Sequence, residues 1–263
     1  MNIYLHELRA NRKSTILWTL SMIGLVLLFL LMFPSFSREA EEFKLVLEGF
    51  PVAVKKAVGL SLETITTLLG FYSYVFLYVT LCGAIQAMNL GLSIVSKEAR
   101  IKTAEFLLSK PVTRTEVITS KLLAALTILV LTNIVFMAAA AAIASMVASE
   151  SFSLKLFLMI SLTMFFLQVI FLTLGTLISS FAPKIKSVLS VSLGTVFALF
   201  IIGMFASVTD DHTLKYASPF KYFDPAEIVK NSSYDGRFLG LSIGIALAAT
   251  AASYVIFAKQ DIS

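Results

Sequence analysis

The sequence predicts an all-α polytopic membrane protein that crosses the bilayer six times. Hydrophobic residues make up 58% of its 263 residues and charged residues only 14%, whereas soluble domains carry about 25% charge. Six apolar stretches have the roughly 20-residue length that a spanning helix needs. None of the six contains Asp, Glu, Lys, Arg or His. The bilayer is therefore the solvent in which this chain folds.

The predicted spans form one transmembrane domain that covers residues 1–263. They are Thr15–Phe33, Ile65–Gly91, Leu122–Val147, Leu156–Phe181, Val188–Val208 and Phe238–Ala258. Spans of a β-barrel would be about 10 residues long with alternating polarity, which these continuous runs are not. The first run has 19 residues, longer than the apolar core of a signal peptide, so we interpret it as a retained span.

An even number of spans places both termini on the same side of the membrane. The segments on that side hold twelve Lys and Arg against five acidic residues, and the opposite segments hold nine against eleven. Basic residues concentrate in cytoplasmic loops. The sequence therefore predicts a multi-pass protein of the cell membrane with both termini in the cytoplasm.

Two segments that flank the first span have apolar residues at helical spacing. The sets are Met1, Tyr4, Leu5 and Leu8 before the span, and Phe43, Val46, Leu47 and Phe50 after it, where Pro51 ends the pattern. Each set predicts a short amphipathic helix. The N-terminal one is expected at the cytoplasmic interface, and packing on the protein's own surface is the alternative for both.

Two local patterns mark helix starts between the spans. Asp224 as N-cap, Pro225 at the first helical position and Glu227 at the third predict an outer helix from Pro225 to about Asn231. Thr113 and Glu116 form a capping box that opens a helix running into the third span.

The cytoplasmic segment 92–121 is predicted to form a helix–break–helix elbow. Its first helix runs from about Ser96 to Ser109 and breaks before Pro111, because a residue preceding proline avoids the α region. The elbow carries the charged residues Glu98, Arg100, Lys102 and Glu105 beside the apolar residues Phe106, Leu107 and Leu108. An apolar patch ringed by charge suits docking to a soluble partner. On pattern alone, a helix whose Phe and Leu dip into lipid is equally consistent.

This elbow resembles the cytoplasmic signature of ABC-2 type transporter permeases. In that family Thr-x-Glu is followed by large apolar residues and then by Pro-Val-Ser/Thr-Arg, and here the match runs from Thr103 through Glu105 and Phe106 to Pro111 and Arg114. The order of elements is also similar, as is the outer segment Ser218–Pro225.

The resemblance implies a permease subunit that acts with partners. It implies two cytoplasmic ABC ATPase subunits docking on the elbow through Glu98, Arg100, Lys102, Glu105, Phe106, Leu107, Leu108, Pro111 and Arg114. It also implies a dimer with a second permease subunit, either the same chain or a paralogue, and export as the direction of transport. None of the 12 glycines is followed by Lys, so a P-loop Gly-Lys is absent. No cofactor is expected in this chain, which is not itself an enzyme, and ATP and Mg belong to the ATPase.

Two patterns inside the spans predict contacts. Tyr78, Cys82, Gln86 and Asn89 share one helix face, which indicates either the lining of a translocation path or interhelical hydrogen bonding. Asn133 and Gln168 stand alone in their spans and are interpreted as interhelical. Gly240, Gly244, Ala248 and Ala252 form a small-residue seam that permits close helix packing.

Composition argues against other classes of function. The basic residues form no single patch, so no nucleic acid is expected, and one cysteine with two distant histidines offers no metal site. Spans without ionisable residues argue against an ion-coupled secondary transporter. A non-transporting subunit that anchors or regulates an ABC ATPase would keep the same elbow and stays as the alternative.

Overall fold

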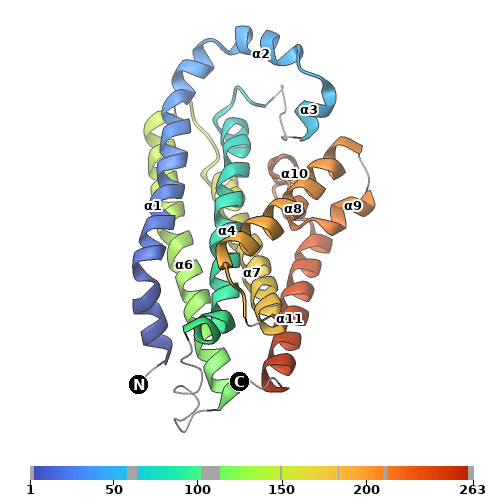
Figure 1. The fold of residues 1–263 in the computed structure, drawn as a ribbon. Coiled ribbons are helices and arrows are strands. Elements are labelled where there is room, and N and C mark those ends of the chain that lie inside the picture. The colour runs from blue at the N-terminus through green and yellow to red at the C-terminus, as the bar shows by residue number, and fades with distance from the viewer. Residues whose placement is uncertain are drawn as a thin grey trace.

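The computed structural model describes residues 3–57, 64–101, 113–148, 150–182, 184–209 and 212–259. Six of the helices in these ranges are long and apolar enough to cross a membrane. They are α1 (Ile3–Arg38), α4 (Leu68–Ile101), α6 (Arg114–Val147), α7 (Leu154–Phe181), α8 (Val188–Thr209) and α11 (Gly236–Lys259). The described ranges contain no strand, so the prediction of an all-α fold with six spans is confirmed. Both termini lie at one end of the bundle (Figure 1).

The N-terminal segment differs from its prediction. Residues from Ile3 onward are not a separate interfacial helix but the first turns of α1, which runs without a break to Arg38. No Gly or Pro interrupts the chain before Thr15, and Asn11 and Thr15 donate side-chain hydrogen bonds to the carbonyls of Glu7 and Asn11. The helix therefore begins before the apolar run that starts at Thr15, and its polar residues in 3–14 lie outside that run.

The segment after the first span forms two short helices, α2 (Ala40–Glu48) and α3 (Val52–Ala57), separated at Pro51. The helix predicted before Pro51 is therefore confirmed. Figure 1 shows α2 and α3 as an arch over the end of the bundle opposite the termini. Leu47 packs on the core while Phe50 is exposed, and α3 packs against α8.

Both predicted helix starts are confirmed at the level of single hydrogen bonds. The outer region contains α9 (His212–Ala217), the 3-10 helix η1 (Pro219–Lys221) and α10 (Pro225–Asn231). The Asp224 carboxylate accepts from the backbone N–H of Ala226 at 2.9 Å. At the start of α6, the Thr113 hydroxyl accepts from the N–H of Glu116 at 3.2 Å, and the Glu116 carboxylate accepts from the N–H of Thr113 at 2.8 Å.

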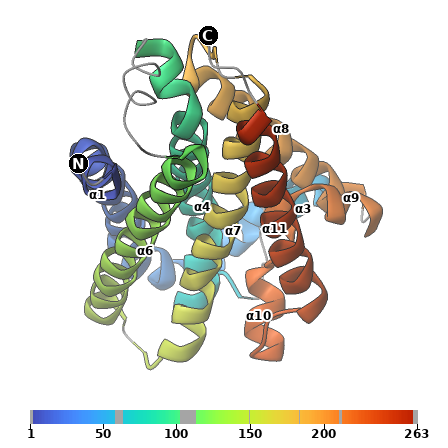
Figure 2. The ribbon, with the colours of Figure 1, turned by 90° about the horizontal axis from the view of Figure 1, so that it is seen from below.

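The centre of the bundle is the contact between α4 and α7, the most extensive helix pair in the described structure (Figure 2). Gly91 lies so close to α7 that a Cβ there would overlap the carbonyl oxygen of Leu172, and a Cβ at Gly175 would lie 2.8 Å from the carbonyl oxygen of Met88. The Ser179 hydroxyl lies 3.3 Å from the Gly91 carbonyl, which accepts its hydrogen bond. Small residues at this crossing let the two backbones meet.

Among the described residues, no helix packs on the two glycines of the small-residue seam of α11. A Cβ built on Gly240 or Gly244 meets no described atom within 4 Å, and both glycines are exposed. The seam that does pack inside the bundle lies on α4, where Gly83, Ala87 and Gly91 are buried at four-residue spacing. The four-residue spacing of Gly83, Ala87 and Gly91 is visible in the sequence of the second span but was not used to predict a packing seam there.

Candidate functional site

Polar side chains from four helices meet near the middle of the bundle. Gln86 on α4 is 2% exposed and donates from its Nε2 to the Thr132 hydroxyl of α6 at 3.3 Å. Its Oε1 accepts from the Nε2 of Gln168 on α7 at 3.2 Å. Gln168 in turn accepts at its Oε1 from the Nδ2 of Asn133 on α6 at 2.6 Å. We call Gln86, Thr132, Asn133 and Gln168 the amide network.

The amide network reaches α1 through Thr19, whose hydroxyl lies within 3.4 Å of the Thr132 hydroxyl. Buried polar groups in hydrocarbon are costly unless they are hydrogen-bonded. One atom of the network has no partner among the described residues, the Oδ1 of Asn133. The network thus joins four spans through hydrogen bonds and leaves one buried acceptor open.

The face of α4 predicted from sequence divides into parts with different surroundings. Gln86 faces α6 and α7 and is not among the residues that line the cavity described below. Tyr78 stacks on Phe29 of α1 with ring centroids 6.1 Å apart, and its hydroxyl lies 3.0 Å from that of Tyr74. Asn89 is half-buried and makes no hydrogen bond to a described residue. The geometry around Gln86 is that of an interhelical contact.

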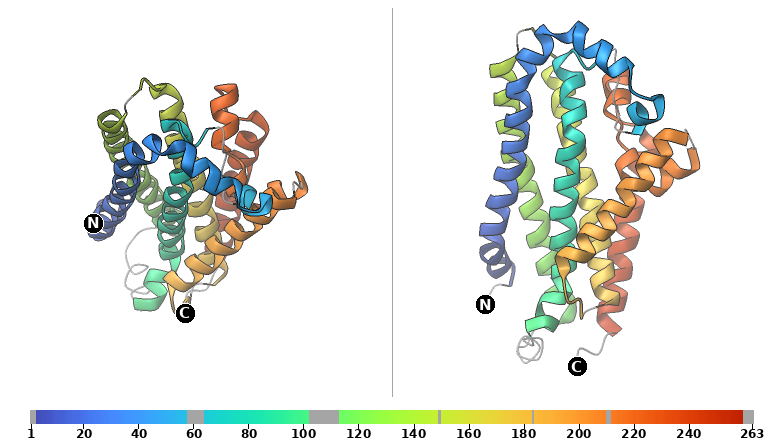
Figure 3. Two further views of the ribbon diagram at one scale, coloured as in Figure 1. Left: turned by 90° about the horizontal axis from the view of Figure 1, so that it is seen from above. Right: turned by 45° about the horizontal axis from the view of Figure 1, so that its top comes forward.

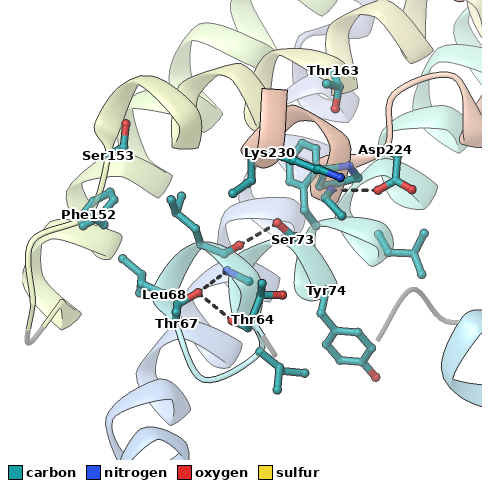
Figure 4. A pocket seen from close by; sticks show the side chains of 18 of the residues that line it. Thr64, Thr67, Leu68, Ser73, Tyr74, Phe152, Ser153, Thr163, Asp224 and Lys230 are labelled. Carbon is teal, nitrogen blue, oxygen red and sulfur yellow. Dashed lines mark hydrogen bonds between the residues drawn. The ribbon is translucent and has the colours of Figure 1, made fainter. Parts of the chain in front are cut away.

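Segments at the end of the bundle opposite the termini line a cavity of about 1060 Å³. Its walls come from the end of α1, residues 64–80 before and at the start of α4, the segment that joins α6 to α7, the outer half of α7, and residues 219–230. Figure 4 shows Thr67 just before α4 and Ser73 in α4 on one wall, and the N-cap Asp224 and Lys230 of α10 on another. We call it the outer cavity, and no motif in the sequence had indicated it.

Four charged residues line the outer cavity in two groups. Glu150, Asp224 and Lys230 are exposed, whereas Lys221 is half-buried. Burial lowers the pKa of Lys221, the Asp224 carboxylate raises it, and the Lys215 ammonium lowers it again. No ion pair joins Lys221 to a carboxylate in the described part of the chain. The cavity therefore has one partly desolvated cation in its wall.

The predicted coupling elbow is described only at its two arms. Glu98 and Arg100 belong to the last turns of α4, which lie across the axis of its span in Figure 3, and Arg114 is the first residue of α6. The other residues predicted for coupling lie outside the described residues, namely Lys102, Glu105, Phe106, Leu107, Leu108 and Pro111.

A buried lysine ties these two arms together. Lys121 on α6 is 4% exposed, and its Nζ donates to the Ile94 carbonyl of α4 at 2.6 Å. Sequence analysis did not single it out. The signal was its position three and four residues after Ile118 and Val117, which places it on the buried face of α6.

The fold agrees with a comparison against protein families. The family model described as "ABC-2 family transporter protein" matches residues 1–262. A search of curated proteins found no match. Because the family match covers essentially the whole chain and the structure has six helices able to span a membrane, this protein belongs to the ABC-2 transporter family.

Proposed function

We propose that the chain is the permease subunit of an ABC exporter, powered by two separate ABC ATPase subunits. A second permease subunit, the same chain or a paralogue, completes the complex. The observation that carries this proposal is the match of residues 1–262 to the ABC-2 family, together with the six spans. The end of the bundle that holds both termini faces the cytoplasm, because its segments are the richer in Lys and Arg.

The arrangement of α4 and α6 supports docking of the ATPase between them. α4 continues to Ile101, beyond its candidate span, which ends at Ile94, and α6 begins at Arg114, eight residues before the apolar run that starts at Leu122. Both extensions lie at the terminus end (Figure 1). The described ends of α4 and α6 therefore lie on the side where a cytoplasmic ATPase would dock.

The contacts at the base of the elbow suggest how a movement of the elbow, caused by the ATPase, would be transmitted to the spans. The Lys121–Ile94 hydrogen bond joins α6 to α4, and the Ser179–Gly91 hydrogen bond joins α4 to α7. The Thr119 hydroxyl lies 2.6 Å from that of Tyr254, which adds α11. Movement of the elbow would shift four packed helices together, because close-packed helices transmit displacement.

The test is co-purification of the ATPase with elbow variants. A buried aromatic anchor costs about 2 kcal/mol or more when truncated, so Phe106→Ala should weaken ATPase association by roughly tenfold or more. Glu105→Lys should leave membrane insertion intact while reducing transport-linked ATP hydrolysis, because a reversed charge at the rim disturbs orientation. Phe205→Ala is the matched control, since Phe205 is an exposed aromatic near the end of α8, and that end lies away from the termini (Figure 1).

Two outcomes would count against docking at the elbow. If Phe106→Ala keeps a full complement of ATPase with unchanged hydrolysis, Phe106 is a lipid anchor. If Phe205→Ala loses as much ATPase as Phe106→Ala, the effect is a general loss of folding.

A further inference from the structure

We propose that the outer cavity binds an amphiphile with an anionic headgroup, drawn from the outer leaflet of the bilayer. This extends the proposed function by assigning a ligand class to the exporter, and it rests on the proposed orientation, which places the cavity on the outer side. Three properties of the cavity carry it: its length, the change in polarity along its walls, and the position of Lys221.

The length of the outer cavity matches one leaflet. Its lining on α4 extends from Leu68 to Thr80, and its lining on α7 extends down to Leu167. Twelve helical residues rise about 18 Å, while half of a hydrocarbon core is about 15 Å. The cavity therefore reaches from the outer surface to about the middle of the membrane, where the amide network, which begins at Gln86 and Gln168, closes the bundle below it.

Hydroxyl groups gather at the mouth of the outer cavity, and both apolar side chains and further hydroxyl groups line its walls deeper in. Thr64, Thr67, Ser151 and Ser153 belong to segments at the outer end of the bundle. Further in, Phe220 points toward α7 and α8, with its ring 5.4 Å from that of Phe171 and 5.3 Å from that of Phe200. A polar opening over walls that carry Phe76, Leu77 and Leu167 is a pattern that a headgroup followed by an acyl chain would fit.

The hydroxyl groups deeper in the cavity already use their protons in hydrogen bonds within their own helices. Ser73, Thr80 and Thr163 donate their hydroxyl protons to the carbonyls of their own helices, at 2.7 to 2.8 Å. Nothing there compensates a buried charge, and burying an uncompensated charge is costly. The charged part of a ligand must therefore stay near the mouth.

Lys221 determines the sign of that charge. It is the most buried of the charged lining residues, and its side chain passes alongside Gly203, six residues from the outer end of α8. Its ammonium has no carboxylate in ion-pair contact among the described residues, and Lys230 adds a second cation at the mouth. The acids Glu150 and Asp224 are exposed and solvated. The Asp224 carboxylate acts on Lys221 without an ion-pair contact, so an anionic headgroup would give the half-buried ammonium a direct charged partner.

The experiment measures lipid binding to the full chain, purified in detergent without the ATPase, by native mass spectrometry. Dioleoylphosphatidylglycerol is the anionic probe, dioleoylphosphatidylcholine the zwitterionic one, and glycerol 3-phosphate the headgroup without chains. One phosphatidylglycerol should bind with a Kd about tenfold below that of phosphatidylcholine, as expected for one charge-assisted hydrogen bond. Glycerol 3-phosphate should not bind, because the apolar interior contributes most of the contact.

Three variants locate the site. Lys221→Gln should remove the preference for phosphatidylglycerol, and Ser73→Phe should weaken binding of both lipids by filling the cavity. Lys155→Gln is the matched control, because Lys155 is an exposed cation at the same end of the bundle that does not line the cavity. Gel filtration of each variant shows that it is folded.

The proposal is overturned if the two lipids bind equally, if glycerol 3-phosphate binds as well as phosphatidylglycerol, or if Lys155→Gln matches the effect of Lys221→Gln. Unchanged lipid binding to a folded Ser73→Phe variant would also overturn it. None of these measurements involves ATP hydrolysis or the elbow. Their failure is therefore distinguishable from a failure of ATPase docking.

Discussion

Asn133 donates a hydrogen bond to Gln168 at 2.6 Å, while its own Oδ1 meets no partner in the described part of the chain. Both side chains are almost fully buried, at 4% and 0% exposure. The Asn133 Nδ2 thus joins α6 to α7, while the Asn133 Oδ1 is left without a partner among the described residues. Buried acceptors of this kind are commonly satisfied by an internal water.

This contact predicts the energetics of the amide network. Gln168→Leu leaves the Asn133 Nδ2 and the Gln86 Oε1 without their side-chain partner, so it should cost about 1–2 kcal/mol of unfolding free energy. The double variant Gln168→Leu/Asn133→Leu should cost less than the sum of the two single variants, because the two residues share one hydrogen bond. Unfolding in sodium dodecyl sulfate, followed by circular dichroism, measures these values. Strict additivity would show that the two side chains do not interact.

A control for the network lies on the same helix. Asn89→Leu removes an amide that is half-buried and makes no hydrogen bond to a described residue. Its cost should stay within about 0.5 kcal/mol. A loss at Asn89 as large as that of Gln86→Leu would mean that hydrogen bonding is not what distinguishes the two positions.

The crossing of α4 and α7 predicts a strong effect from one methyl group. Gly91→Ala would push a Cβ into the Leu172 carbonyl, which is backbone and cannot rotate away. We expect a loss of about 1–3 kcal/mol, typical of overpacking. Gly194→Ala is the matched control on α8, because nothing lies within 4 Å of its Cβ position. The same unfolding measurement compares the two, and equal stabilities would contradict the close approach.

The seam on α11 predicts a different outcome from the same kind of change. Gly244→Leu should leave the unfolding free energy of the isolated chain within about 0.5 kcal/mol, since its Cβ position is open. If the seam packs against a second subunit, this variant should reduce the size of the purified complex on gel filtration. Normal yield and normal complex size would show that the seam faces lipid.

The buried lysine predicts a variant that separates docking from coupling. Lys121→Met keeps the length of the side chain and removes its hydrogen bond to Ile94. ATPase association should be retained, because the surface of the elbow is unchanged, while substrate-stimulated hydrolysis should fall several-fold. Co-purification and hydrolysis rates of the complex test this. Loss of the ATPase itself would show instead that Lys121 is needed to shape the docking surface.

Orientation is tested by labelling single cysteines with an impermeant maleimide after Cys82→Ser. Cysteines at Glu48 and Glu227, which are exposed at the end opposite the termini, should react in intact cells. A cysteine at position 110 should react only after the membrane is permeabilised. Labelling of position 110 from outside would overturn the proposed topology.

Some of this architecture was decided by the sequence alone. The spans follow from apolar length, because hydrocarbon accepts only long uncharged helices. The starts of α6 and α10 follow from Thr113 and Asp224, because a cap is completed by residues only two or three positions away. The continuity of α1 through residues 3–14 was missed, because an amphipathic pattern does not say whether a helix ends where the apolar run begins.

Only the tertiary structure decided which helix faces meet. Gln86 and Gln168 are 82 residues apart, and the outer cavity is assembled from the start of α4, the outer half of α7 and residues 219–230. Two small-residue seams were present; the one with Gly91 packs against α7, whereas no described atom lies within 4 Å of the Cβ position of Gly244 in the other. In a bilayer an apolar helix face is as well solvated by lipid as by another helix. Hydrophobicity therefore places each helix in the membrane, and close packing and interhelical hydrogen bonds determine its neighbours.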